Sequence, residues 1–200
     1  MIMAQQYYFN TSKTNMGMLG AFVTRTFYYP SILFNACFNP LLGQSWYNRI
    51  DEHVILGALP ITFMTKRLAK DHNVKGVISM NEDYELRYIY NSEQTWNLYG
   101  IQLLKLATQD LFASPTIPQI NKAIEFIEEI KRADGTVYVH CKAGKTRSTT
   151  VVVCYLMKCK NMNAKEAQEF IKSKRPQVWL RKPQLDCIEN FYFEEVAHTK

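Results

Sequence analysis

The residues from Val137 to Lys158 read VYVHCKAGKTRSTTVVVCYLMK, and they place Cys141 between two apolar runs. Residues 136–140 are mainly β-branched or aromatic, as expected of a strand that is covered on both faces. Residues 147–160 are apolar nearly all round, which predicts a buried helix. The segment therefore predicts a buried strand, a short loop and a buried helix. The loop is either a phosphate-handling catalytic turn or an ordinary turn that carries a buried thiol.

Predicted strands and helices alternate along the chain from Trp46 onward. This alternation is typical of an α/β layered domain with a central, mostly parallel sheet flanked by helices. The only plausible domain boundary lies near Gly43, and it separates residues 1–43 from a domain of residues 44–200. The apolar patterns predict further strands at 53–57, 74–80 and 101–106, and helices at 61–73, 117–135, 163–175 and 183 to about 198.

The first 43 residues carry no acid, and their stretch from 16 to 43 is apolar and aromatic with Arg25 as its only charge. A spanning helix needs ~20 predominantly apolar residues, and Pro30 and Pro40 interrupt this stretch. The composition favours a mitochondrial targeting segment or an anchor on a membrane surface. An N-terminal arm packed on the domain is the alternative.

The net charge of +6 is unevenly distributed. Residues 142–182 contain eleven Lys or Arg against two acids, a local balance of +9, whereas residues 51–141 contain nine basic against twelve acidic residues. A solvated helix face is the ordinary explanation of a charge run. This run also surrounds a candidate anion site, so it favours an acidic substrate, an anionic membrane surface, or both. No nucleic-acid partner is predicted.

The five cysteines form no CxxC pair, and their number is odd. A disulfide framework or a structural zinc site is therefore not expected, and a reducing compartment fits better. One thiol is a candidate reactive group, and the other four are most simply small apolar residues.

The loop CKAGKTR has the composition of an anion-binding turn. Successive backbone N–H groups of a tight loop can converge on an anion, and the helix that follows adds its positive end. Ala143 and Gly144 are small enough to let the backbone approach a phosphate closely. Arg147 offers a planar fork for two phosphate oxygens. The same surroundings would lower the pKa of Cys141 and make it a nucleophilic thiolate.

Three other interpretations of this loop are weaker. A nucleotide-binding P-loop needs glycine five positions before Gly144, and this chain has Val139 there. An inert core thiol does not explain the small residues and the arginine on one turn. A metal site has no ligand spacing to support it, because the histidines other than His140 are scattered at positions 53, 72 and 198. Neither a metal nor another cofactor is therefore expected.

The residues HCKAGKTRS, 140–148, resemble the HCxxGxxR[ST] signature of cysteine-dependent phosphatases, the dual-specificity enzymes included. The likeness covers most of the chain from Trp46 to about Phe193. It continues in WYNRIDEHVILGALP, GVISMNEDYELR, LKLATQDL and LRKPQL, which are similar to the lipid-directed mitochondrial phosphatidylglycerophosphate phosphatases. The resemblance implies a cysteine-phosphatase-like domain that hydrolyses phosphomonoesters without a metal.

The resemblance also implies catalytic roles at five positions. Cys141 would be the nucleophile that forms a phosphocysteine intermediate, and Arg147 would bind the transferring phosphoryl group. Ser148 would hydrogen-bond the leaving thiolate in the second step. His140 would orient the loop and help to set the pKa of the thiol. Asp110 would be the general acid that protonates the leaving alkoxide and then activates water.

Substrate-binding positions follow from the same likeness. The segment NEDYELR has Asp83 where the family pattern has glutamate, and it would line the mouth of the site with Glu82, Tyr84 and Glu85. Arg181 would complete a basic rim. Lys142 and Lys145 suit a substrate with more than one negative group. The stretch CKAGK is also similar to the corresponding loop of phosphoinositide 3-phosphatases. The loop itself would bind substrate through Lys142, Ala143, Gly144, Lys145 and Thr146, where Lys145 and Thr146 replace the usual Arg-Ser of the family.

Three functions remain open at this point. The leading one is hydrolysis of phosphatidylglycerophosphate to phosphatidylglycerol, a step of the cardiolipin pathway, by an enzyme associated with the mitochondrial inner membrane. The second keeps the chemistry and changes the substrate to phosphoproteins or phosphoinositides. The third is a catalytically silent module that binds phosphate groups.

Overall fold

The computed structural model describes residues 43–87, 90–110 and 113–197. Nearly all of the predicted N-terminal segment, residues 1–42, lies outside the described residues. A single sheet of five strands forms the centre, in the order β1-β2-β5-β3-β4. The strands are β1 Tyr47–Arg49, β2 Val54–Gly57, β3 Val74–Ser79, β4 Gln102–Lys105 and β5 Thr136–His140. Only the β1–β2 pair is antiparallel, which confirms the prediction of a mostly parallel sheet.

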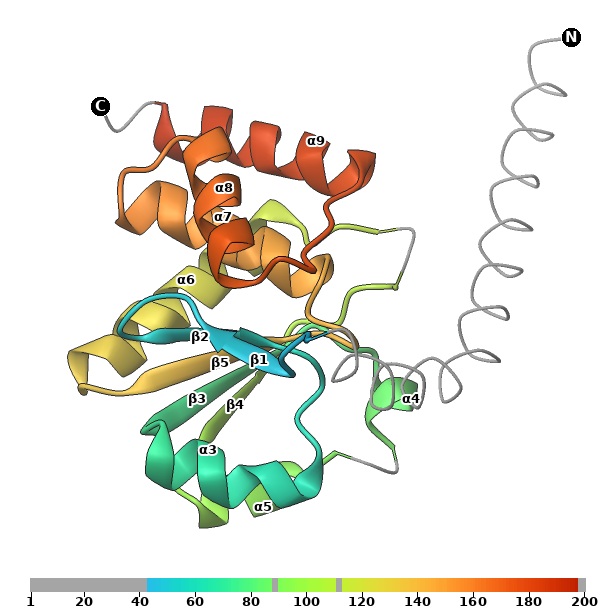
Figure 1. Cartoon of the computed structure of the whole chain (residues 1–200), viewed down its shortest axis with the longest axis vertical. Coiled ribbons are helices and arrows are strands. Elements are labelled where there is room, and N and C mark those ends of the chain that lie inside the picture. Colours follow the sequence, from blue (N-terminus) through green and yellow to red (C-terminus); the bar gives the residue numbers. More distant parts are fainter. Residues whose placement is uncertain (1–42, 88–89, 111–112, 198–200) are drawn as a thin grey trace, which may run out of the picture.

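Helices cover both faces of this sheet (Figure 1). On one face lie α6 Ile117–Arg132, α7 Arg147–Cys159, α8 Ala164–Lys174 and α9 Lys182–Phe191, which continues as a π-helix, Tyr192–Val196. On the other lie α3 Thr65–Asp71, preceded by a 3-10 turn at Thr62–Met64, and α5 Glu93–Leu98. Within the described part of the chain, no helix combines the length and apolar character needed to cross a bilayer.

Strand β5 divides the core into two clusters. Its side chains alternate, so Val137 and Val139 join the cluster beneath α6 and α7, whereas Tyr138 joins the smaller cluster beneath α3 and α5. Every residue of β5 is buried, as its β-branched and aromatic sequence predicts. Helix α7 is also buried, from Arg147 to Met157, because α6, α8 and α9 all pack against it.

Most predicted elements are found, with small shifts of their ends. Helix α8 has the predicted capping box: the Asn163 side chain accepts from the Glu166 N–H, and Glu166 accepts from the Asn163 N–H. The sequence did not predict β1, α5 or the four-residue helix α4, Asp83–Leu86. Segments this short offer no periodicity, and packing against the rest of the domain determines their conformation.

The topology gathers several loops at one edge of the sheet. Strands β2, β3 and β5 run parallel, so the segments that follow them start at the same edge. The Met80 N–H donates to the His140 carbonyl at 2.9 Å, which joins the segment after β3 to the end of β5. In open parallel sheets, this carboxyl edge is where ligands bind.

Candidate active site

The backbone of the loop between β5 and α7, residues 141–146, is held from outside by its carbonyl groups. The Lys142 carbonyl accepts from the Leu59 N–H at 3.3 Å, and the Lys145 carbonyl accepts from the Trp179 N–H at 2.9 Å. Arg175 donates from Nε to the Gly144 carbonyl at 2.8 Å and from Nη2 to the Ala143 carbonyl at 3.1 Å.

The outward carbonyls determine where the amides point. No described peptide bond is cis, and in a trans peptide the N–H points opposite to the preceding C=O. The N–H groups of residues 143–146 are therefore directed toward the inside of the loop. Arg147 opens α7, so the first amides of that helix lie at the same place. Converging amides of this kind make an anion-binding concavity.

Gly144 allows this loop to turn. Its φ is +63°, and a Cβ on it would lie 2.3 Å from the carbonyl oxygen of Gly57. An L side chain would therefore be strained by the backbone angle and would also collide with β2.

Replacing Gly144 with alanine is expected to destabilise the fold and to lower kcat/KM on a soluble phosphomonoester by at least tenfold. The backbone angle alone costs about 1–2 kcal/mol, and the contact with Gly57 adds to it. Gly100→Ala is the matched control, because φ is +68° there and an added Cβ meets nothing within 4 Å. The control should lose stability but keep its activity. Equal activity losses in the two variants would contradict the role given to the loop geometry.

The Cys141 thiol lies at the base of the loop and is buried. Burial acts to raise its pKa, but the charge of Arg147 and hydrogen bonds from Ser148 outweigh burial, so the pKa is lower than usual. Ser148 Oγ donates to Cys141 Sγ at 3.3 Å. The thiol can therefore ionise more readily than an ordinary cysteine.

The Arg147 guanidinium is fully buried and makes several hydrogen bonds. Nη1 and Nη2 donate to the two carboxylate oxygens of Glu85 at 2.9 and 3.1 Å. Nη1 also donates to the carbonyls of Met80 and Thr108. Burial acts to lower the pKa of Arg147, but Glu85 and the charges of Cys141 and Asp110 raise it above its usual value. Among the described residues Nε has no partner, so its N–H is available to an oxygen inside the loop.

Glu85 was expected at the mouth of the site, and the structure instead buries it completely. It belongs to α4, which begins just after β3 and brings the carboxylate against Arg147. Tyr84 and Glu82 are half-buried, and Asp83 is exposed and pairs with Lys105 at 3.7 Å. Burying a guanidinium requires a partner charge, and sequence spacing alone could not show that Glu85 supplies it.

Asp110 lies beside the loop, where the resemblance places a general acid. Its Oδ1 is 3.1 Å from Arg147 Nη2, and its Oδ2 is 2.6 Å from Lys142 Nζ. The side chain is 8% exposed. A carboxylate between two cations, next to a cradle of amides, has to share Arg147 with any phosphate that enters.

His140 is buried next to the nucleophile and receives or donates one hydrogen bond with Tyr90, at 3.2 Å from Nε2 to the hydroxyl. Burial lowers the pKa of His140 to about 3, so the imidazole is neutral at physiological pH. The charge that lowers the pKa of the thiol therefore comes from Arg147, and His140 contributes only as a neutral group. The expectation that His140 helps to set that pKa therefore stays a prediction, and a neutral His140 could do so only through hydrogen bonding and packing.

The remaining predicted binding residues lie in the loop or close to it. Lys142, Lys145 and Thr146 are half-buried, and Thr146 precedes the first turn of α7. Arg181 is half-buried at the start of α9, and its guanidinium lies 4.4 Å from the centre of the Trp179 ring. The Trp179 backbone is hydrogen-bonded to the Lys145 carbonyl, so the ring on which Arg181 lies is held next to the loop.

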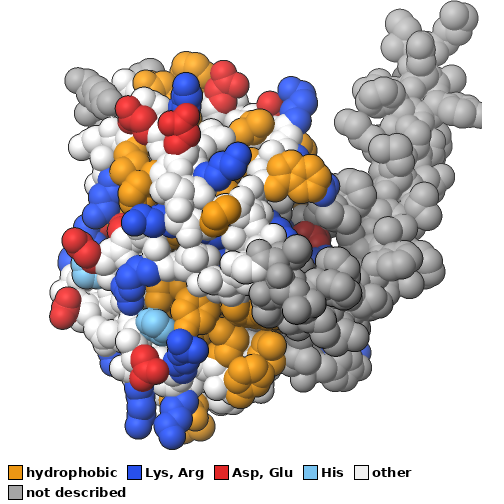
Figure 2. Space-filling view, viewed as in Figure 1, with side chains coloured by type: hydrophobic (Ala, Val, Ile, Leu, Met, Phe, Trp, Pro, Cys, Tyr) orange, Lys and Arg blue, Asp and Glu red, His pale blue; other side chains and the backbone are white. Residues whose placement is uncertain are grey.

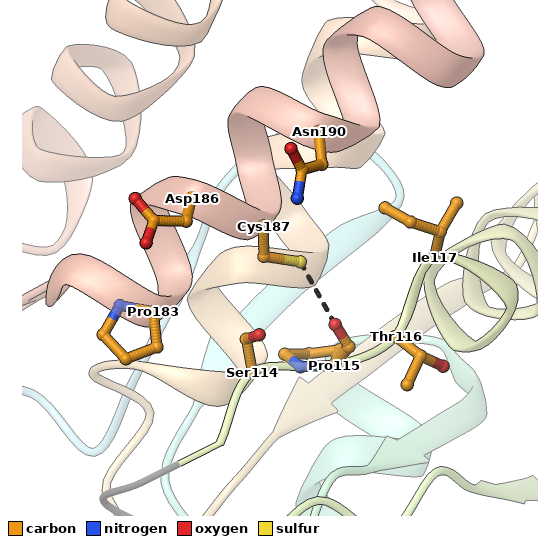
Figure 3. A pocket seen from close by; sticks show the side chains of 8 residues that line it. All are labelled: Ser114, Pro115, Thr116, Ile117, Pro183, Asp186, Cys187 and Asn190. Carbon is orange, nitrogen blue, oxygen red and sulfur yellow. Dashed lines mark hydrogen bonds between the residues drawn. The ribbon is translucent and has the colours of Figure 1, made fainter. Parts of the chain in front are cut away.

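Helix α9 holds the segment that follows Asp110. Gln184 Nε2 donates to the Ala113 carbonyl at 2.9 Å, and the Cys187 thiol donates to the Pro115 carbonyl at 3.1 Å. Figure 3 shows Cys187 directed from α9 toward Pro115. A cavity of about 370 Å³ lies between the two segments. Sequence reasoning missed Gln184, since an amide in the first turn of a helix is usually solvated.

Gln184→Leu is expected to lower kcat by up to about 10²-fold, because a small displacement of the segment would move Asp110 away from its reacting position. The measurement is a double-mutant cycle with Asp110→Asn. If Gln184 acts through Asp110, Gln184→Leu should have little further effect on kcat in the Asp110→Asn background. Fully additive losses would contradict this coupling.

Two further observations concern the cysteines and metals. Cys141, Cys154, Cys159 and Cys187 are all free thiols. In residues 43–87, 90–110 and 113–197, no three His, Cys, Asp or Glu side chains are grouped so that they could hold a metal ion. The chemistry that this part of the chain offers is that of a thiol, a guanidinium and a carboxyl group around an anion cradle.

These features define a cysteine-dependent phosphatase site. The sequence pattern of the family described as "Dual specificity phosphatase, catalytic domain" matches residues 62–192. The chain is 39% identical over 184 residues to the phosphatidylglycerophosphatase and protein-tyrosine phosphatase 1 of Mus musculus, covering 90% of this chain and 95% of that one. Identity to the Homo sapiens protein of the same name is 38% over 185 residues, with 91% and 92% covered. The chain belongs to the dual specificity phosphatase family.

Solved structures agree with this assignment. The crystal structure of PTPMT1 in complex with PI(5)P is 40% identical, with a TM-score of 0.75 over 78% of this chain and 100% of that chain. The structure of Tk-PTP in the active form is 28% identical, with a TM-score of 0.68 over 74% of this chain and 97% of that one. The predicted cysteine-phosphatase-like fold is confirmed.

Proposed function

We propose that this protein is a phosphomonoesterase that converts phosphatidylglycerophosphate to phosphatidylglycerol. The observation that carries the proposal is the match to the Mus musculus phosphatidylglycerophosphatase and protein-tyrosine phosphatase 1 across nearly the full length of both chains. Two Arabidopsis thaliana proteins named phosphatidylglycerophosphate phosphatases support it, at 36% and 37% identity. The chain covers only 55% of the first of these and 78% of the second.

In the first step of the proposed reaction, the Cys141 thiolate attacks the phosphorus atom of the terminal phosphate. The bond from phosphorus to the glycerol oxygen breaks, and Asp110 donates a proton to that oxygen. The phosphoryl group, now on sulfur, is held by the loop amides and by Arg147, which stabilise the negative charge of the transition state. Preorganised donors of this kind supply the largest part of such catalysis.

In the second step, water attacks the phosphocysteine, and Asp110 accepts a proton from that water. The sulfur–phosphorus bond breaks, inorganic phosphate leaves, and Cys141 returns to the thiolate. The Ser148 hydroxyl, 3.3 Å from the sulfur, donates a hydrogen bond to the leaving thiolate. Neutral His140 keeps the loop in place from below, through its contact with Tyr90.

The proposed substrate has a second negative group, the phosphodiester of the lipid. Lys142 and Lys145 of the loop, together with Arg181, suit that charge, and Tyr84 lies on the segment after β3. Ala143, Gly144 and Thr146 contribute backbone amides to the terminal phosphate. Glu85 serves the substrate indirectly, by holding Arg147.

Phosphoinositides are a second candidate substrate class. The crystal structure of PTPMT1 contains PI(5)P, and that chain is 40% identical to this one. Phosphotyrosine in proteins is a further candidate, because the Mus musculus relative is also named a protein-tyrosine phosphatase. The silent binding module is disfavoured, since the thiol, the guanidinium and the candidate general acid all lie within one site.

We also propose that the enzyme works at the mitochondrial inner membrane, with residues 1–43 as the targeting or membrane-associating segment and residues 44–200 as the phosphatase domain. The support is the acid-free, apolar sequence of residues 1–43 and the family match to residues 62–192.

The substrate assignment is tested with phosphate release from phosphatidylglycerophosphate, phosphoinositides and a phosphotyrosine peptide, the lipids being presented in detergent micelles. The proposal predicts the highest kcat/KM for phosphatidylglycerophosphate, with or without a chelator. Peptide turnover far above that of either lipid would overturn it in favour of a protein phosphatase.

The pH dependence of kcat/KM should be bell-shaped. Activity rises with pH as Cys141 loses its proton, and the lowered pKa of this thiol places the rise below the range of an ordinary cysteine. Activity falls at higher pH as Asp110 loses the proton that it must donate. Asp110→Asn should lower kcat by about 10²–10⁴-fold and remove the descending limb for an alkyl phosphate. A descending limb that persists in this variant would assign the acid to another group.

A further inference from the structure

We propose that the surface around Trp179 docks against an anionic lipid bilayer and presents the Cys141 loop to it. For this purpose the Trp179 surface consists of residues 172, 174, 179, 182 and 185. The inference rests on the proposed function in one respect, that the substrate is a lipid whose acyl chains stay in the membrane while its terminal phosphate enters the loop.

Trp179 is an exposed aromatic side chain attached to the catalytic loop. It is 61% exposed, whereas Trp96 is fully buried and Trp46 is half-buried. The backbone N–H of Trp179 donates to the Lys145 carbonyl, so the backbone that carries the indole is held at the edge of the loop. Arg181 lies against the ring at 4.4 Å. Trp179 therefore lies where it would meet anything that approaches the site from this side.

Apolar surface continues beside the indole. Leu185, on α9, is 42% exposed. Between α8 and α9 lies a cavity of about 220 Å³ that is open to this side. Its lining consists of Thr149, Gln168, Lys172, Val178, Trp179, Leu180 and Leu185. Exposed aromatic and aliphatic side chains next to a hollow offer area for insertion at the boundary between headgroups and acyl chains.

The charges around Trp179 are positive. No acid occurs between Glu169 and Asp186, and Lys172, Lys174 and Lys182 are exposed. Figure 2 shows Lys and Arg side chains next to apolar ones over the segment that joins α8 to α9. Asp186 is 3.3 Å from Lys182 and offsets part of its charge, so Lys172 and Lys174 supply most of the field.

A bilayer fits this surface better than a protein partner does. Tryptophan is enriched at membrane interfaces because its ring is apolar and its N–H is polar. Lysines next to the tryptophan are attracted to anionic lipids, and each lysine near the membrane surface adds a similar amount to the binding free energy. The loop of residues 141–146 is adjacent, and the headgroup of a lipid held in the same bilayer can reach it.

The direct test is tryptophan fluorescence of the full-length protein on vesicles. Phosphatidylcholine vesicles with and without phosphatidylglycerol are compared, and brominated lipids serve as quenchers. The difference between the wild type and Trp179→Phe isolates the signal of Trp179. The proposal predicts a blue shift and quenching of this signal on the anionic vesicles. Bound protein whose Trp179 signal neither shifts nor is quenched would overturn it.

Activity gives a second readout. Trp179→Ala should lower kcat/KM on substrate embedded in vesicles by about tenfold, through loss of inserted apolar area. Replacing Lys172 and Lys174 together by glutamine should lower it by about fivefold per lysine at low salt. Both variants should hydrolyse p-nitrophenyl phosphate at the wild-type rate. Equal losses on the soluble substrate would show that they damage the site and would overturn the proposal.

Leu98→Ala is the matched control. Leu98 is 85% exposed at the end of α5, just before β4, so it lies at the amino edge of the parallel strands, opposite to the loop. The Leu98→Ala variant should bind vesicles and hydrolyse embedded substrate as the wild type does. Sedimentation velocity tests whether a second copy of the chain covers the Trp179 surface instead. A dimer that dissociates on Trp179→Ala would overturn the proposal that this surface docks against a bilayer.

The failure of this inference and the failure of the proposed function are distinguishable. Phosphatidylglycerol vesicles contain no phosphomonoester, so the fluorescence of Trp179 on them decides docking without turnover. Turnover of phosphatidylglycerophosphate in micelles decides the proposed function without a bilayer.

Discussion

Replacing Cys141 with serine is expected to lower kcat by ~10⁴-fold or more, the scale of loss when the nucleophile of a catalytic unit is removed. Burial acts to raise the pKa of Cys141, but the charge of Arg147 and hydrogen bonds from Ser148 lower it. A serine hydroxyl at the same place would stay protonated and could not attack. The amide cradle and Arg147 remain in the variant, so binding of inorganic phosphate should persist, as measured by calorimetry.

Cys154→Ala is the matched control for this prediction. Cys154 lies in the middle of α7, seven residues after Arg147, and burial raises its pKa well above the usual value. Its thiol therefore stays protonated, and the variant should keep wild-type kcat with a modest loss of stability. A serine variant of Cys141 that turned over at the wild-type rate, on any phosphomonoester, would remove the basis of the proposed mechanism.

Replacing Glu85 with glutamine is expected to have the largest effect on stability of any single change near the site. The substitution keeps the shape of the side chain but leaves the Arg147 guanidinium without its bidentate partner in a fully buried place. Removing one member of a buried ion pair costs about 3–5 kcal/mol. The free energy of unfolding should fall by this amount in urea titrations, and kcat should fall as well because Arg147 is no longer fixed.

Asp83→Asn is the control in the same segment. This substitution also removes an ion pair, the one between Asp83 and Lys105 at 3.7 Å, but the Asp83 side chain is 90% exposed. Exposed pairs contribute at most about 1 kcal/mol, so this variant should stay close to the wild type. Similar losses of unfolding free energy in the two variants would mean that the Arg147–Glu85 pair does not hold the site together.

The sequence predicted those parts of the site that are contiguous along the chain. Cys141 and Arg147 lie six positions apart between a strand and a helix whose apolar runs are long enough to recognise, so one turn of backbone had to bring them together. Asp110 could be proposed only through the family resemblance, since a single carboxylate in a loop has many ordinary explanations. Its place beside Lys142 and Arg147 comes from the packing of separate segments.

Other parts of the site could not be predicted, because they depend on contacts between distant segments. Arg175 was counted only as one charge of the basic run, and the structure buries it fully, where it holds the carbonyls of Ala143 and Gly144. Glu85 was expected at the mouth and lies under Arg147. In both cases the identity of the residue was visible, but burial and partner are set by the tertiary fold.

Cys141 is proposed to form a covalent phosphocysteine, and rapid acid quenching followed by mass spectrometry of peptides can detect this intermediate directly. Asp110→Asn with p-nitrophenyl phosphate is the suitable pair, because this leaving group needs no proton whereas the hydrolysis of the intermediate needs the base. A phosphoryl group is expected to accumulate on the peptide that carries Cys141. Turnover of this substrate with no phosphoryl group on any peptide, or with one on a different residue, would contradict it.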